Sequence, residues 1–138
     1  MYRKILIAYD GSEPGRKAFN MALDLAVRDK ADLYVLSVVR TLDVADDVET
    51  EAVIENSRAY HTEQFALLKH LISEKGIKGH FEVTVGHPAE QIIYSADRHD
   101  VDLIVIGHRG RSKFARLLLG SVSKNVVQYA DRPVMVVR

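Results

Sequence analysis

The sequence predicts a doubly wound α/β domain. Short runs of branched apolar residues, as expected for strands buried on both faces, alternate with longer segments whose apolar residues recur at helical spacing. Five such strands and four such helices follow one another, which indicates a parallel sheet covered by helices on both faces. No internal repeat, low-complexity tract or linker interrupts this pattern, so we expect one domain over residues 1–138.

The first half of the chain begins with a strand, a helix and a second strand. Ile5–Ala8 is the first continuous apolar run, and Leu33–Val39 is the second. Between them, Ser12 suits a helix N-cap and Pro14 suits the first helical turn. We expect that helix to end near Asp29–Lys30.

The stretch from Arg40 to Glu51 is acidic. Arg40 is its only basic residue, and its carboxylates are Asp43, Asp46, Asp47, Glu49 and Glu51. We expect a solvated loop that leads into the acidic first turn of the next helix, and the alternative is a mobile flap near a ligand. That helix should run to about Lys75, where Gly76 suits its C-terminal cap.

The second half of the chain supplies the remaining elements. Residues 81–85 alternate between apolar and polar side chains, which indicates a half-exposed strand at an edge of the sheet. Pro88 suits the first position of a short helix. Leu103–Ile106 is predicted as the fourth strand, a last helix starts at Ser121, and Val134–Val137 is the fifth strand.

Composition excludes several classes of protein. The 19 basic and 19 acidic side chains balance, which gives no sign of a broad nucleic-acid or membrane surface. The absence of cysteine excludes disulfides, thiolate catalysis and cysteine-based metal sites. The first apolar run is too short for a signal peptide, and no run approaches the roughly 20 residues of a membrane span. We expect a cytoplasmic protein that neither binds nucleic acid nor inserts into a membrane.

A glycine-rich stretch joins the fourth strand to the last helix. Glycines stand at positions 107, 110 and 120, and hydroxyl side chains follow at Ser121 and Ser123. Glycine lets the backbone approach an anion closely, and a helix N-terminus offers unpaired N–H groups at the positive end of its dipole. The stretch therefore predicts a phosphate-binding loop. The alternative is a loop with turn glycines followed by a serine-capped helix.

This pattern, Gly-x2-Gly-x9-Gly-Ser, resembles the ATP-binding motif of the universal stress protein family. The resemblance extends over the whole chain through the opening Ile5-Leu-Ile-Ala-Tyr-Asp-Gly-Ser, the middle Gly86-His-Pro-Ala-Glu-Gln-Ile and the ending Arg132-Pro-Val-Met-Val-Val. It implies the strand order 3-2-1-4-5, in which the chain changes direction between strands one and four. Ligands of such sheets bind outside the carboxyl ends of the strands at this switch point.

The resemblance also implies the site residues. The family positions around adenine and ribose match Ala8, Asp10, Val38 and Ile106. The positions around ribose and phosphates match Gly107, Arg109, Gly110, Gly120, Ser121, Val122 and Ser123. By its chemistry alone, Asp10 at a strand end can accept a hydrogen bond from a ribose hydroxyl or an adenine amino group, or it can brace its own turn. Val38 and Ile106 can sandwich a base or serve as plain core.

The implied ligand is ATP, accompanied by Mg²⁺ or Mn²⁺ that the phosphates themselves largely hold. The six histidines show no metal-ligand spacing, so we expect no metal site built by the protein. His108 lies inside the glycine loop, where a loop or phosphate-neighbour role is favoured over catalysis. The Walker and Gly-x-Ser-x-Gly patterns are absent, and no nucleophile–base pair is evident. We therefore assign no catalytic residue.

Three functions are compatible with these observations. The first is a regulatory stress-response protein that holds ATP and hydrolyses it slowly or not at all. The second is an ATP-using enzyme for nucleotidyl or phosphoryl transfer, and the third is a nucleotide-free interaction module. An apolar last strand, Val134–Val137, predicts a homodimer because an unpaired edge invites another strand. A further protein partner is possible, but the sequence does not identify it.

Overall fold

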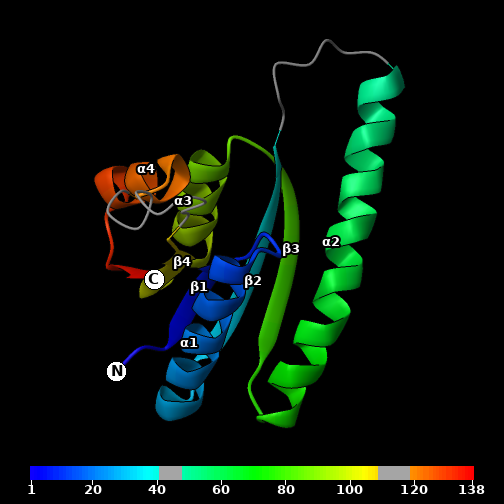
Figure 1. The fold of residues 1–138 in the computed structure, drawn as a ribbon. Coiled ribbons are helices and arrows are strands. Elements are labelled where there is room, and N and C mark those ends of the chain that lie inside the picture. The colour runs from blue at the N-terminus through cyan, green and yellow to red at the C-terminus, as the bar shows by residue number, and fades with distance from the viewer. Residues whose placement is uncertain (41–47, 109–118) are drawn as a thin grey trace.

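The computed structural model describes residues 1–40, 48–108 and 119–138, and every predicted strand and helix is present in it (Figure 1). The elements are β1 (Lys4–Ala8), α1 (Glu13–Asp29), β2 (Asp32–Arg40), α2 (Val48–Glu74), β3 (Gly79–Gly86), α3 (Pro88–His99), β4 (Leu103–Gly107), α4 (Ser121–Tyr129) and β5 (Val134–Val137). Residues 41–47 of the acidic stretch lie outside the described residues, and Glu49 and Glu51 fall in the first turn of α2 as predicted.

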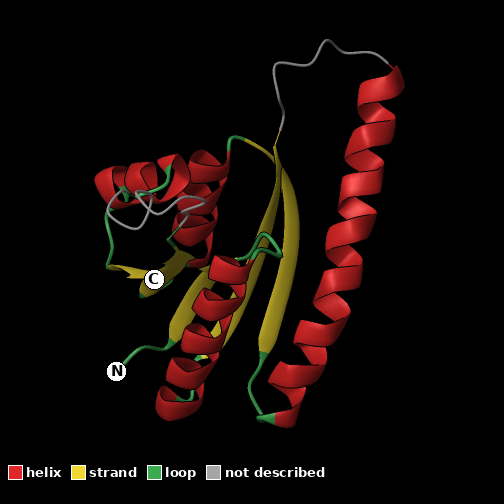
Figure 2. Cartoon of the chain, in the orientation of Figure 1, coloured by secondary structure: helices red, strands yellow, loops and turns green. Residues whose placement is uncertain are grey.

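The five strands form one parallel sheet in the order β3-β2-β1-β4-β5, which confirms the predicted topology. Ala8 pairs with Leu36 of β2, and Ile7 pairs with Val105 of β4. These two pairs fix which side chains of the three central strands stand at the same level of the sheet. The strands lie between helices, as Figure 2 shows.

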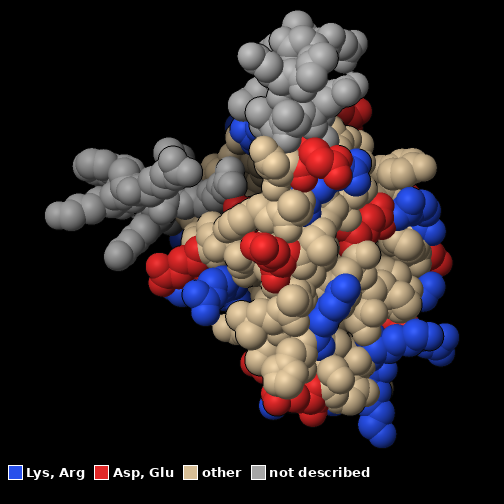
Figure 3. Space-filling view, turned by 90° about the vertical axis from the view of Figure 1, so that its right-hand side faces the viewer, with Lys and Arg blue, Asp and Glu red and all other residues tan. Residues whose placement is uncertain are grey.

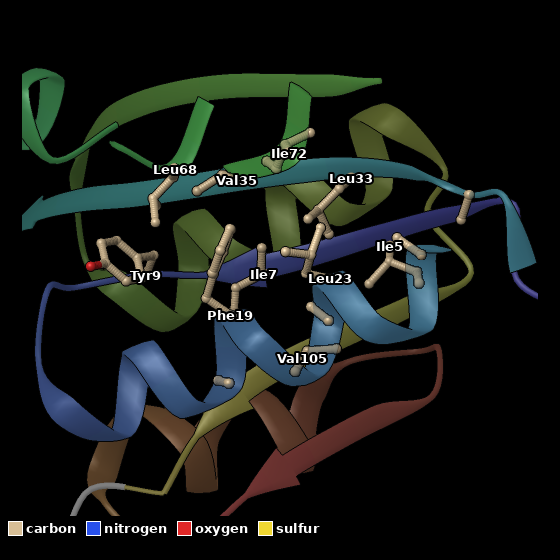
Figure 4. Close-up of a cluster of buried hydrophobic side chains, with 14 of the residues drawn as sticks. Ile5, Ile7, Tyr9, Phe19, Leu23, Leu33, Val35, Leu68, Ile72 and Val105 are labelled. Carbon is tan, nitrogen blue, oxygen red and sulfur yellow. The ribbon is translucent and has the colours of Figure 1, made fainter. Parts of the chain in front are cut away.

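Each face of the sheet packs against its own pair of helices. One cluster joins the strands to α1 and α2 and includes Ile5, Ile7 and Phe19, all of which are buried (Figure 4). The other cluster joins the strands to α3 and α4 and includes Leu6 and Ile92. Because side chains alternate along a strand, residues 5 and 7 face one pair of helices while residues 6 and 8 face the other.

Two caps confirm the local predictions from sequence. The Ser12 hydroxyl caps α1 by accepting a hydrogen bond from the backbone N–H of Gly15 at 3.1 Å. Gly76, just after α2, has a φ of 69°, a left-handed conformation that glycine adopts without a steric penalty. The Ser12 side chain and the Gly76 backbone thus mark the start of α1 and the end of α2, as the sequence predicts.

The charged side chains of the surface are mixed. Lysine, arginine, aspartate and glutamate side chains are interspersed among uncharged residues on the face seen in Figure 3. Within the described part of the chain, no helix combines the length and the apolar character that crossing a bilayer requires.

The carboxyl end of β4 makes a close backbone contact with the start of α1. A Cβ atom placed on Gly107 would lie 2.6 Å from the carbonyl oxygen of Pro14 and 3.1 Å from the backbone nitrogen of Gly15. These are backbone atoms, so relief of the clash requires α1 to move as a unit. Glycine at position 107 is therefore required by packing, whatever ligand approaches it.

Gly107→Ala is expected to lower the free energy of unfolding by about 1–3 kcal/mol, the usual cost of forcing extra volume into a packed site. Gly79→Ala is the matched control, because its added Cβ would meet only side-chain atoms of Ile72 and Phe81 at 3.1 Å, and these can shift. Urea unfolding of both variants measures the difference. Equal losses for the two variants would show that the backbone contact at Gly107 is not what matters.

Candidate functional site

A cleft with a free volume of about 130 Å³ opens at the carboxyl ends of β1, β2 and β4, on the face covered by α3 and α4. Its described walls are formed by Ala8, Tyr9, Asp10, Ser12, Pro14, Gly15, Leu36, Val38, Arg40, Pro88, Ile92, Ile106, Gly107, Val122 and Ser123. The cleft therefore lies at the switch point between β1 and β4, where the topology predicts a ligand site.

The floor of the cleft is apolar. Ala8 and Leu36 are paired in register on β1 and β2, and Ile106 stands at the same level on β4, because Ile7 pairs with Val105. Ile92 of α3 and Val122 of α4 close the sides. A narrow apolar space of this kind suits the flat face of an aromatic ring, which gains by leaving water and needs no hydrogen bond there.

Asp10 stands at one wall and also braces the loop between β1 and α1. Its Oδ1 atom accepts a hydrogen bond from the backbone N–H of Ser12 at 3.0 Å and another from the Ser12 hydroxyl. A Cβ atom on Gly15 would lie only 2.6 Å from this oxygen, so the carboxylate is packed tightly against the first turn of α1. The bracing role considered for Asp10 is thus observed, and it holds the carboxylate in place at the cleft.

The opposite side of this loop is covered by α2. The Tyr60 hydroxyl lies 3.3 Å from the Cβ position of Gly11, whose φ is 80°. Tyr9 packs edge-on against Phe19, and burial raises the pKa of the Tyr9 phenol. Next to Tyr60, burial lowers the pKa of His61, while the negative charge of Asp10 acts in the opposite direction. The Nδ1 atom of His61 is buried without a hydrogen-bond partner among the described residues.

The first turn of α4 forms the wall next to β4. Gly120 is the N-cap, with φ −61° and ψ 159°, and no side chain caps the helix. Ser123 is 2% exposed, and its hydroxyl donates a hydrogen bond to the carbonyl oxygen of Gly107 at 2.8 Å. This bond ties α4 to the end of β4. In this structure the proton of the Ser123 hydroxyl is therefore directed at the backbone and not at a ligand.

The structure brings most of the predicted site residues together. Those that line the cleft are Ala8, Asp10, Val38, Ile106, Gly107, Val122 and Ser123. Gly120 and Ser121 begin α4 but do not line the cleft, and Arg109 and Gly110 lie outside the described residues. His108 is buried and does not line it either, and its backbone N–H donates to Val137 in β5.

The sequence places residues 8–12, which include Tyr9 and Ser12, at the switch point, but sequence reasoning missed the lining residues Pro14, Gly15, Leu36, Arg40, Pro88 and Ile92. The alternation of side chains along a strand could have predicted Leu36 and Arg40 as lining residues, because each lies two residues from Val38 and therefore on the same face of the sheet. Pro88 and Ile92 depend on how α3 crosses the sheet, which no local pattern specifies. Within the described residues, no group of three histidine, aspartate or glutamate side chains is placed to hold a metal ion.

The burial of His61 makes folding depend on pH. Since its pKa in the folded protein lies below the unfolded value of about 6.5, the unfolded state binds more protons as the solution becomes acidic. The contribution of neutral His61 is complete above that value and is lost as the pH falls through the folded pKa.

His61→Gln is therefore expected to reduce the loss of stability between pH 7.5 and 5.5, as measured by thermal unfolding across that range. The matched control is His70→Gln, since His70 lies further along α2 with a side chain that is 68% exposed. If the pH profile of His61→Gln coincides with that of the wild type, burial of this imidazole does not control the acid sensitivity.

Comparison with known proteins identifies the family. A family model described as the universal stress protein family matches residues 1–138. Universal stress protein YxiE of Bacillus subtilis is 34% identical over 148 residues, with 100% of both chains covered. Universal stress protein UspA from Lactobacillus plantarum superposes with a TM-score of 0.90 at 26% identity, covering 99% of this chain and 98% of that one. The universal stress protein from Archaeoglobus fulgidus in complex with dAMP gives 0.70 at 26% identity, with 99% and 98% covered. The chain therefore belongs to the universal stress protein family.

Proposed function

We propose that this protein is a regulatory stress protein that binds an adenine nucleotide in the cleft at the carboxyl ends of β1, β2 and β4. The observation that carries the proposal is the meeting of three features at the switch point: an apolar floor, the Asp10 carboxylate and the first turn of α4. Each matches one part of a nucleotide. The similar protein from Archaeoglobus fulgidus that was solved with dAMP supports the same ligand class.

In the proposed complex the base occupies the apolar part of the cleft beside Val38 and Ile106. The ribose then lies next to Asp10. A carboxylate offers about four acceptor positions, so Asp10 can accept from Ser12 and also from a ribose hydroxyl. Because the bonds from Ser12 already hold the carboxylate, nucleotide binding requires little reorganisation of this wall.

The phosphates are assigned to the first turn of α4. The first N–H groups of a helix have no partner within the helix, and the positive end of the dipole favours an anion. Gly107 and Val122 line the cleft beside this turn. ATP fits the assignment with Mg²⁺ or Mn²⁺ held mainly by its own oxygens, since Asp10 is the one acid among the described cleft residues.

Hydrolysis is proposed to be slow or absent. Rapid phosphoryl transfer requires a group that orients the attacking water and groups that stabilise the transition-state charge. The described cleft wall contains one acid, Asp10, which already braces the Ser12 turn. A cytoplasmic location is part of the same proposal, and the cysteine-free sequence suits a reducing compartment.

Mass spectrometry of the small molecules released from freshly purified protein is the direct test of the proposed ligand. An adenine nucleotide in near-stoichiometric amount supports the proposal. Protein that releases none and binds neither AMP nor ATP in calorimetry would favour the nucleotide-free interaction module instead.

Gly120→Val is expected to weaken ATP binding at least about tenfold, or roughly 1.4 kcal/mol, because it places a branched side chain beside the phosphates. The extended backbone at Gly120 accommodates valine, and no side-chain cap is lost. Binding of adenosine, which has no phosphate, should change far less.

The control for that variant is Asn125→Val, which introduces the same side chain on the exposed face of α4. Calorimetry with ATP and with adenosine measures all three proteins. An unchanged ratio of the two affinities in Gly120→Val would contradict the assignment of the phosphates to this turn.

We further propose that the protein forms a homodimer through β5. Of the described strands, β5 pairs only with β4 and forms one edge of the sheet. The carbonyl oxygens of Pro133 and Val137 accept hydrogen bonds from the backbone N–H groups of Ile104 in β4 and of His108, which follows β4. By the alternation of a parallel ladder, the backbone groups of Val134 and Val136 point away from β4. A second copy related by a two-fold axis would satisfy them.

Val136→Pro is expected to convert the dimer to a folded monomer. Proline removes an N–H that β4 does not use, and an edge strand tolerates proline where the N–H faces outward. Met135→Pro is the contrasting variant, since it removes an N–H directed at β4 and should lower the melting temperature. Sedimentation equilibrium at micromolar concentration measures the oligomeric state of each variant. A dimer that survives Val136→Pro would show that β5 is not the interface.

A further inference from the structure

Arg40 is the last residue of β2 and lines the cleft. It follows Leu36 and Val38 in the strand alternation, so its side chain leaves the same face of the sheet as theirs. In the register with β3, Val38 pairs with Thr84 and Arg40 pairs with Gly86, the last residue of that strand. The guanidinium therefore belongs to the outer end of the cleft, beyond the apolar floor.

The described cleft wall contains two charged side chains, Asp10 and Arg40. Ala8, the last residue of β1, pairs with Leu36; Asp10 follows two residues after the end of β1, and Arg40 is the last residue of β2, the neighbouring strand. Both charges thus line the same cleft, at the carboxyl ends of adjacent strands. Arg40 is exposed, and within the described residues it forms no ion pair.

Arg40 is also well separated from the turn assigned to the 5′-phosphates. That turn adjoins β4, and β1 lies between β4 and β2. Two strand spacings amount to about 9–10 Å. A nucleotide whose ribose contacts Asp10 therefore has its 5′-phosphates on one side of that carboxylate and Arg40 on the other.

We propose that the site selects adenosine nucleotides that carry a second phosphate on the 2′- or 3′-oxygen of the ribose, and that Arg40 is the residue that recognises it. The inference rests on the proposed nucleotide function. In dinucleotide-binding sheets an acid binds a free ribose hydroxyl, whereas a nearby arginine accommodates a ribose phosphate, and this cleft contains a residue of each kind. The guanidinium presents a planar fork of donors that matches two phosphate oxygens.

A ribose phosphate bound beside Asp10 would require a nearby cation. A ribose phosphate lies within a few ångströms of the carboxylate that binds the neighbouring hydroxyl, and two like charges repel. In the proposed complex Arg40 offsets this repulsion, because it lines the same cleft at the end of the adjacent strand. Without it, a second phosphate at the ribose is expected to weaken binding.

Isothermal titration calorimetry with AMP, adenosine 3′,5′-bisphosphate and adenosine 2′,5′-bisphosphate tests the proposal on the full chain. Wild-type protein should bind at least one bisphosphate about tenfold or more tightly than AMP, and the preferred isomer identifies the ribose oxygen. In Arg40→Gln the ratio of bisphosphate affinity to AMP affinity should fall to about one or below. The control, Arg58→Gln, removes the same charge from an exposed position on α2 outside the cleft and should keep the ratio.

Each other outcome overturns one specific statement. Failure of AMP and ATP to bind the wild type overturns the proposed function itself. Binding of AMP with no preference for either bisphosphate, or a preference that persists in Arg40→Gln, leaves the nucleotide site standing and overturns the role of Arg40. An equal loss of affinity for AMP and both bisphosphates in Arg40→Gln would place Arg40 on the base or the 5′-phosphate, and this also overturns it.

Discussion

The contact between the end of β4 and the start of α1 determines the geometry of the cleft. Gly107 approaches the backbone of Pro14 and Gly15 so closely that a single added methyl group would clash. This approach brings the β1–α1 loop against the end of β4, although nearly a hundred residues separate them. Ser123 then joins α4 to the carbonyl of the same glycine. One residue therefore connects the two halves of the sheet where the chain changes direction.

Asp10 extends this arrangement into the site. Its hydrogen bonds with Ser12, together with the bond between Ser12 and Gly15, form a short chain that stops the loop from changing shape independently of α1. On the other side of the loop, α2 places the Tyr60 hydroxyl against Gly11, and the charge of Asp10 acts on the pKa of His61. The carboxylate is thus held by Ser12, and the loop that carries it is packed against α2 at Gly11. A ligand that contacts it binds a preorganised group and avoids much of the entropic cost of ordering one.

Sequence patterns determined most of the fold because each strand and helix depends on local chemistry. The apolar run Ile5–Ala8 and the Ser12 cap are examples, and both are present. The walls of the site were harder to predict from the sequence, since they depend on the register of the strands and on how the helices cross the sheet. In the sequence Arg40 is the single base of an acidic stretch, and it lines the cleft because β2 extends to it, two residues beyond Val38. Likewise the sequence marked Gly107 as a phosphate contact, whereas its packing against Pro14 appears only in three dimensions.

The distribution of charge around the cleft argues for a particular shape of ligand. The carboxylate of Asp10 stands at the centre, with the positive end of the α4 dipole toward β4 and the guanidinium of Arg40 toward β2. A polyamine or another cation would meet repulsion at both ends, and a purely apolar ligand would make no use of these charges. A ligand with hydroxyl donors in the middle, anionic groups on both sides and a flat apolar ring satisfies every wall. The charges around the cleft are therefore consistent with the phosphorylated nucleoside that we propose as its ligand.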